Sequence, residues 1–125
     1  MQHAVRKYLA ALESGDAERA AALFVPEGWV QSPFLGKVSV RDYVNKVASA
    51  SSHAKLTVHD VLVSAEGHLR AVAYYHYDWS LRDGSNVAFD CADIFNFDAA
   101  SGHIESILLV YDTDPVRAVV EHKYP

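Results

Sequence analysis

The sequence lacks the features that mark several large classes of protein. It has one cysteine, Cys91, in 125 residues, so an intrachain disulfide framework is excluded. The net charge is −5 and no run of Lys or Arg forms a basic track, which argues against nucleic acid or an anionic membrane as a partner. No apolar stretch approaches membrane-spanning length, and the first residues lack the apolar segment of a signal peptide. We therefore expect a cytoplasmic protein.

Length and composition suit one hydrophobic core. Half of the residues are hydrophobic, acids and bases are interspersed, and neither repeats nor low-complexity segments occur. A chain of this length ordinarily forms one domain. We expect residues 1–125 to fold as a single domain.

The first half of the chain predicts three helices. Apolar residues recur at helical spacing, and Gly15 suits a left-handed helix end. Asp16 and Ser39 are typical N-caps, and Asp42 follows Ser39 at the third helical position. The three segments are residues 2–13, 17–24 and 40–50. A short strand is expected at residues 28–32.

The second half predicts a meander of strands followed by a short helix that begins at Asp114-Pro115. The strands are expected at residues 56–65, 69–81, 86–97 and 104–112. Helices followed by an antiparallel meander indicate an α+β fold. We expect a curved antiparallel sheet with its concave face covered by the N-terminal helices, so that the two enclose a cone.

The register of the central hairpin decides which side chains face the cone. Asp83-Gly84 fits a two-residue type I′ turn, and residues that pair across strands share a face. The expected pairs are Ser80 with Val87, Asp78 with Phe89, His76 with Cys91, and Tyr74 with Asp93. In this register Tyr75, Tyr77 and Trp79 lie on the outer face, where we expect them to form a homodimer interface.

Four segments together resemble the NTF2-like superfamily, in particular its ketosteroid isomerase and SnoaL-like polyketide cyclase branches. They are Tyr8-Leu-Ala-Ala-Leu-Glu-Ser-Gly15-Asp16, Trp29-Val-Gln-Ser-Pro-Phe-Leu-Gly36, Cys91-Ala-Asp93-Ile-Phe-Asn-Phe97 and Gly102-His-Ile104. Each motif alone is weak, but their order and spacing cover nearly the whole chain. The resemblance implies the cone-shaped fold.

The resemblance also implies site residues. Ketosteroid isomerases hold an oxyanion with a Tyr on the first helix and a protonated Asp on the strand that corresponds to residues 86–97. Tyr8 and Asp93 match these positions. The general base of that family is an Asp before the loop proline, where this chain has Ser32. The resemblance therefore implies a retained oxyanion pair and a missing base.

Each candidate for chemistry has a structural alternative. Asp93 is predicted to be a carboxyl of raised pKa that donates to a developing oxyanion, or else an acid satisfied by a neighbouring Tyr or the backbone. Tyr8 and Tyr74 could bond the substrate or Asp93, or simply pack. His76 and Asp78, two apart on one strand, could replace the base, or could line a hydrated cone mouth.

Further residues are expected to line the cone and contact a substrate. The predicted binding residues are Tyr74, Trp29, Ser32, Phe34, Phe89, Cys91, Phe95 and Tyr111. His59 could face inward too, and a metal held by His59, His76 and Asp78 is conceivable, but no metal-ligand spacing motif supports it. We expect no metal and no cofactor.

Two functions remain open from the sequence. The first is an acid–base enzyme of isomerase, dehydratase or cyclase type that acts on a small hydrophobic carbonyl or hydroxyl compound. The second is a non-catalytic protein that binds a small molecule in the same cone. The substitution at Ser32 favours binding, whereas the His76–Asp78 pair favours catalysis.

Overall fold

The structure is a computed structural model that describes residues 1–120. Its helices are α1 (Gln2–Ser14), α2 (Ala17–Ala21), α3 (Val40–Ala50) and α4 (Asp114–Val120). Its strands are β1 (Phe24–Ser32), β2 (Gly36–Ser39), β3 (Ser51–Val63), β4 (Arg70–Leu81), β5 (Asn86–Phe97) and β6 (Ile104–Leu108). The bounds of α3 and β5 are those predicted. The second helix is shorter than predicted, because the chain already extends as a strand from Phe24.

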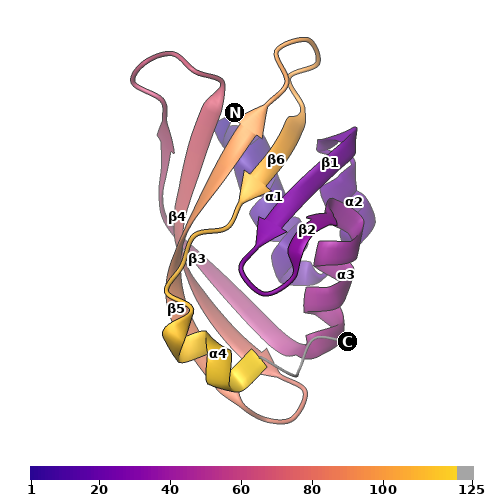
Figure 1. Ribbon diagram of the computed structural model, residues 1–125, viewed down its shortest axis with the longest axis vertical. Coiled ribbons are helices and arrows are strands. Elements are labelled where there is room, and N and C mark those ends of the chain that lie inside the picture. The colour runs from indigo at the N-terminus through magenta and orange to yellow at the C-terminus, as the bar shows by residue number, and fades with distance from the viewer. Residues whose placement is uncertain (121–125) are drawn as a thin grey trace.

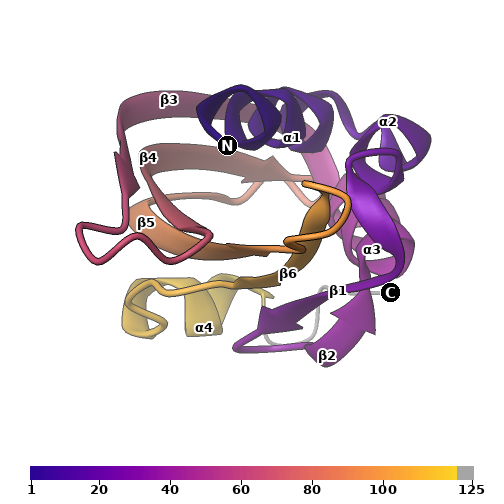
Figure 2. The same cartoon turned by 90° about the horizontal axis from the view of Figure 1, so that it is seen from above.

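The strands form one mixed sheet in the order β2-β1-β6-β5-β4-β3. It curves strongly, with α1, α2 and α3 packed along it and α4 at the opposite end near β5 (Figures 1 and 2). The predicted α+β architecture is confirmed. The predicted meander β3–β6 pairs antiparallel throughout, but the whole sheet is mixed, because β1 runs parallel to β6.

Helix α1 buries the predicted apolar stripe against the sheet, namely Val5, Tyr8, Leu9 and Leu12. The helix ends at Gly15, which adopts a φ of 71° and donates its N–H to the Leu12 carbonyl. This left-handed conformation is one that a residue with a Cβ adopts only at a cost. The short turn to α2 depends on it.

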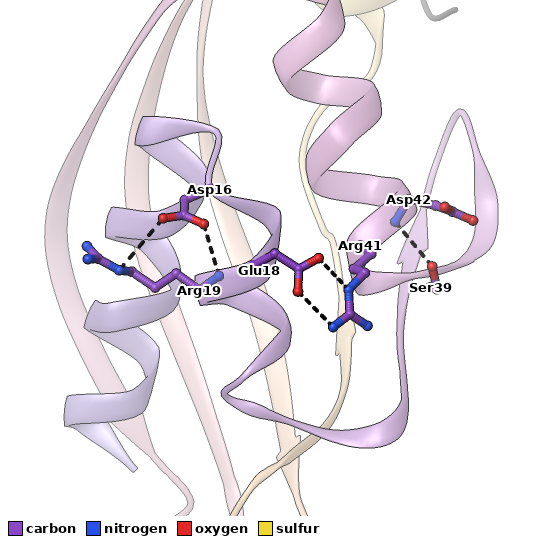
Figure 3. A network of polar contacts seen from close by, with 6 residues as sticks. All are labelled: Asp16, Glu18, Arg19, Ser39, Arg41 and Asp42. Atoms are coloured by element: carbon purple, nitrogen blue, oxygen red, sulfur yellow. Dashed lines mark hydrogen bonds and ion pairs between the residues drawn. The ribbon is translucent and has the colours of Figure 1, made fainter.

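N-caps and two ion pairs, Arg19–Asp16 and Arg41–Glu18, lie at the starts of α2 and α3 (Figure 3). Asp16 Oδ1 accepts from the Arg19 N–H at 3.0 Å, and Ser39 Oγ accepts from the Asp42 N–H at 3.1 Å, so both predicted N-caps are confirmed. Arg41 donates to both carboxylate oxygens of Glu18, at 2.8 and 3.0 Å. The pair is solvent-exposed, so it orients α3 beside α2 more than it stabilises the fold.

The turn between β4 and β5 has three residues rather than two. Leu81 donates its N–H to the Ser85 carbonyl at 2.8 Å, and Gly84 donates to the Leu81 carbonyl at 3.0 Å. Gly84 has a φ of 89°, as expected of the left-handed residue that completes a type I turn in a three-residue hairpin loop. Asp-Gly suits this loop as well as a type I′ turn, but the extra residue shifts the register by one.

A shift of one residue turns every side chain of β4 to the other face. The observed pairs are Ala73 with Asp93, Tyr75 with Cys91, Tyr77 with Phe89, and Trp79 with Val87. Tyr75, Tyr77 and Trp79 are only 2%, 5% and 2% exposed, so their predicted place on an outer interface is wrong. Tyr74, His76 and Asp78 face outward instead of into the cone.

Over residues 1–120, no helix combines the length and the apolar character needed to cross a membrane.

Candidate functional site

Asp93 lies at the centre of the enclosed face, on β5, and its side chain is fully buried. The Tyr75 hydroxyl donates a hydrogen bond of 2.7 Å to Asp93 Oδ2. Asp93 Oδ1 has no hydrogen-bond partner within residues 1–120. Because a buried polar atom without a partner is costly, such atoms in native proteins often mark functional positions.

Burial raises the pKa of Asp93 to about 7, against an ordinary value of 3.8, and the hydrogen bond from Tyr75 partly opposes that rise. The apolar surroundings disfavour the charged form, as the sequence predicted. A carboxyl with this pKa is present in both protonation states near neutral pH. It can therefore accept a proton and return it.

The Tyr8 hydroxyl is a second buried polar group that lacks a hydrogen-bond partner in the described part of the chain. The Tyr8 ring meets the rings of Phe24 and Phe95 edge-on, with centroids 5.8 and 5.6 Å away. Burial raises the pKa of Tyr8 well above its usual value, and the nearby charge of Asp93 raises it further. Tyr8 therefore remains a neutral phenol with a hydrogen to donate.

Aromatic side chains enclose most of the space around Asp93. Tyr77 stacks on Phe89 with ring centroids 5.5 Å apart, and Phe89 lies 4.9 Å from the Tyr111 ring. The aromatic residues that line this cavity are Tyr43, Tyr75, Tyr77, Trp79, Phe89 and Tyr111. The cavity measures about 20 Å³, which is room for about one water molecule. A larger molecule can enter only if these side chains move.

Several predicted site residues lie in or beside this cavity. Asp93, Phe89, Cys91 and Tyr111 line it, whereas Tyr8 and Phe95, whose rings contact each other, are buried in the core outside its lining. Burial raises the pKa of the Cys91 thiol well above its usual value, so this cysteine is a small apolar side chain rather than a nucleophile. The chemical and binding roles of all these residues stay predictions.

Phe34 lies near the cavity because its ring packs against Tyr111, one of the lining residues, with ring centroids 6.4 Å apart. The Arg117 guanidinium of α4 lies 5.5 Å from the Phe34 ring. The β1–β2 loop, Tyr111 and α4 thus meet at one edge of the cavity.

Four predicted residues lie outside the cone. His76, Asp78 and Tyr74 are on the outer face of β4 because of the register shift. Trp29 also faces away from the core: its neighbour Val30 is fully buried, and Lys37 Nζ lies 4.3 Å above the Trp29 ring. The predicted placement of His76 and Asp78 as a base inside the cone is therefore wrong.

Ser32 is buried, 2% exposed, at the end of β1. Its Oγ accepts from the backbone N–H groups of Phe34 and Leu35, at 3.4 and 3.3 Å. A serine that bonds the backbone two and three residues ahead shapes a turn. This geometry explains Ser32 as a loop residue, and it supplies no base.

The sequence interpretation missed Tyr43, Tyr75, Tyr77 and Trp79 as cavity residues. A usable signal was present along β4. One alternate set reads Ala71, Ala73, Tyr75, Tyr77, Trp79 and Leu81, all apolar, whereas the other contains His, Asp and Ser. The apolar set faces the core, as strand alternation requires.

Fold and site together define an NTF2-like α+β protein whose cone contains one buried carboxyl among aromatic rings. The chain belongs to the SnoaL-like family, because residues 5–107 match the model of the SnoaL-like domain. No curated protein matches the chain in sequence.

Solved structures share this fold at low sequence identity. A protein with a ketosteroid isomerase-like fold from Catenulispora acidiphila, in complex with trimethylamine, has a TM-score of 0.78 and 13% identity over 92% of this chain and 89% of its own. An NTF2-like protein of unknown function from Burkholderia pseudomallei has a TM-score of 0.78 and 16% identity over 95% of both chains. A putative polyketide cyclase from Xanthomonas campestris has a TM-score of 0.75 and 15% identity over 94% and 93%. These likenesses show the fold alone.

Proposed function

We propose that this protein is a cofactor-independent acid–base enzyme, of isomerase, dehydratase or cyclase type, for a small carbonyl or hydroxyl compound. The observation that carries the proposal is the unpartnered Oδ1 of Asp93, on a buried carboxyl whose pKa is about 7. With His76 and Asp78 outside the cone, Asp93 is the one carboxyl that lines the cavity among residues 1–120. Proton transfer then falls to Asp93 itself.

The chemistry needs few groups. The ionised Asp93 takes a proton from a carbon beside the substrate carbonyl, and the C–H electron pair moves into an enolate. Once the aromatic side chains have moved, the Tyr8 phenol, which lies outside the lining of the closed cavity, donates a hydrogen bond to the oxygen that gains charge. The protonated Asp93 returns the proton to the same or another carbon, which completes an exchange or an isomerisation. Substrate enters as Phe89 and Tyr111 turn aside.

Deuterium exchange tests this step without knowledge of the natural substrate. Cyclic enones and small ketones are incubated with the protein in D₂O, and loss of the α-proton signal is followed by ¹H NMR. We expect Asp93→Asn to abolish catalysed exchange and Asp78→Asn, the same change on the outer face, to leave it intact. Exchange at equal rates in wild type and Asp93→Asn would refute the proposal.

A second candidate is a binding protein for a small organic cation. Six aromatic rings around one carboxylate suit an alkylammonium ion, which binds aromatic faces and pairs with an anion. The trimethylamine complex of the Catenulispora acidiphila neighbour supports this candidate by analogy of fold. A cation beside Asp93 would lower the pKa of its carboxyl and favour the ionised form.

Calorimetry separates the two candidates. The binding candidate predicts that trimethylammonium binds and that uncharged tert-butanol, of similar shape, does not. It also predicts that Asp93→Asn removes the binding, with no deuterium exchange in any ketone.

A homodimer stays a prediction, and its proposed interface on Tyr75, Tyr77 and Trp79 is excluded by their burial.

A further inference from the structure

The outer face of the sheet carries two imidazoles and one carboxylate that the proposed function does not use. His59, His76 and Asp90 come from three neighbouring strands, β3, β4 and β5. His76 Nδ1 lies 3.0 Å from Asp90 Oδ1, and His59 Nε2 lies 3.3 Å from the same oxygen. The three possible ligand atoms all lie within 4.8 Å of one another. The side chains therefore converge on one point above the middle strand.

The backbone places this cluster through register and a bulge. His76 lies directly opposite Asp90 in the β4–β5 pairing. On the other side, the β3–β4 register shifts between Val58 and Asp60, so that His59 sits at an irregularity of β3. Such bulges redirect side chains. The Tyr74 ring, 4.6 Å from the His59 ring, packs against the redirected imidazole.

We propose that His59, His76 and Asp90 bind one divalent transition-metal ion per chain. Metal–nitrogen and metal–oxygen bonds of about 2.0–2.2 Å place ligands of one coordination shell roughly 3 Å apart. The observed separations of 3.0 and 3.3 Å meet this requirement. The two ring nitrogens lie within 4.8 Å of each other, so the proposed site requires the exposed imidazoles to turn toward a shared ion. Asp90 Oδ1 and the two ring nitrogens would be the ligands.

The donor set also fixes the class of ion. Two imidazoles with one carboxylate suit zinc, cobalt, nickel, copper or iron(II), whereas magnesium and calcium prefer shells made of oxygen. Three protein ligands leave at least one coordination position for water or an external ligand. The site opens to solvent, since His59 and Asp90 are exposed, so an ion can enter without any change in the fold.

The competing interpretation is a hydrogen-bonded His–Asp–His cluster that has no ligand. Both interpretations explain the distances, but they predict different stoichiometry and affinity for the binding of Zn²⁺ or Co²⁺. The metal site predicts a saturable stoichiometry of one ion, whereas the cluster alone predicts only weak binding spread over the surface histidines.

Calorimetry with Zn²⁺ and absorption spectra with Co²⁺ distinguish the two interpretations. Untagged full-length protein carrying His3→Ala is titrated, so that an imidazole near the amino terminus does not compete. We expect one equivalent of Zn²⁺ to bind, Co²⁺ to give a d–d spectrum, and Mg²⁺ and Ca²⁺ not to compete. Zn²⁺ should shift the ring signals of His59 and His76 in NMR spectra.

Matched variants assign the binding to these side chains. His59→Ala and Asp90→Asn should each weaken Zn²⁺ binding by about 10-fold or more. Asp78→Asn removes the same charge from the same face and should leave the affinity unchanged. Circular dichroism checks that each variant folds. Equal Zn²⁺ affinity in wild type, His59→Ala and Asp90→Asn, or a stoichiometry other than one, would overturn the proposal.

Discussion

The Tyr75 hydroxyl reaches Asp93 diagonally across the β4–β5 strand pair. The residue directly opposite Asp93 is Ala73, and Tyr75 lies two positions further along β4. A long aromatic side chain can span this diagonal, and the small Ala73 leaves space beside the carboxyl. The small side chain of Ala73 therefore leaves room for Tyr75 to donate its hydrogen bond of 2.7 Å to Asp93.

Tyr75→Phe tests the electrostatic role of this bond. Because the Tyr75 hydroxyl lowers the pKa of Asp93 against the effect of burial, its removal should raise that pKa above about 7. Titration of the Asp93 carboxyl carbon by ¹³C NMR measures the change. Tyr74→Phe, the same substitution on the outer face, should leave the titration where it is. An Asp93 pKa that falls in Tyr75→Phe would contradict the geometry.

Asp93 should make the folded protein less stable as the pH rises. Its folded pKa of about 7 exceeds its ordinary value of 3.8, so between these values the folded state holds a proton that the unfolded state has lost. The contribution of Asp93 to the free energy of unfolding therefore decreases as the pH rises from about 4 to about 7, where the carboxyl of the folded protein ionises. Relative to Asp93→Asn, wild type should lose about 3 kcal/mol between pH 5 and pH 8. Urea denaturation at both pH values measures the difference, and Asp78→Asn should follow wild type.

Ser32→Ala should affect stability rather than chemistry. The buried Ser32 hydroxyl accepts hydrogen bonds from two backbone N–H groups. Its loss leaves these donors unpaired, which should lower the free energy of unfolding by about 1 kcal/mol. Urea denaturation should show this loss while the deuterium-exchange rate per folded molecule stays constant. If exchange falls and stability does not, Ser32 belongs to the chemistry after all.

Gly28→Ala should destabilise β1 at its irregularity between Phe24 and Trp29. A Cβ built on Gly28 would lie 2.6 Å from the Phe24 Cβ, too close for the Phe24 side chain to escape by a rotation of its ring alone. Because the Phe24 ring packs against Tyr8, a displaced Phe24 would also disturb the packing of the buried Tyr8 ring. We expect a loss of about 1–3 kcal/mol, measured by thermal or urea unfolding. An unchanged melting temperature would contradict this close approach.

Local signals in the sequence predicted the ends of several helices, but not strand β2 or the early starts of β1 and β3. Ser39 with Asp42 marked the start of α3, and Gly15 marked the end of α1, because caps act within a few residues. The burial of Asp93 agrees with the apolar residues at alternate positions of the same strand, Phe89, Cys91, Phe95 and Phe97. The family resemblance, confirmed by the SnoaL-like match, added Tyr8 to the same region.

Longer-range features were not predicted. The parallel pairing of β1 with β6 joins segments far apart in the chain, such as Phe24 and Ile104, and no local pattern reports it. The register of the central hairpin was predicted from turn chemistry, which fits loops of two or three residues around Asp83-Gly84. The apolar alternation of β4 was the stronger constraint, because burying His76 and Asp78 in place of Tyr75 and Tyr77 would cost far more than a change of turn.

The loop of Arg82, Asp83 and Gly84 therefore restricts how relatives of this chain can diverge. Exposed loops usually tolerate insertions and deletions of any length. A shift of the β4–β5 register by one residue would exchange the aromatic interior of β4 for its outer set of histidine, aspartate and serine. A change in the length of this loop is therefore compatible with the fold only where the loop changes its turn type and the register is kept, a constraint imposed on a solvent-exposed turn by the buried carboxyl and rings some distance away.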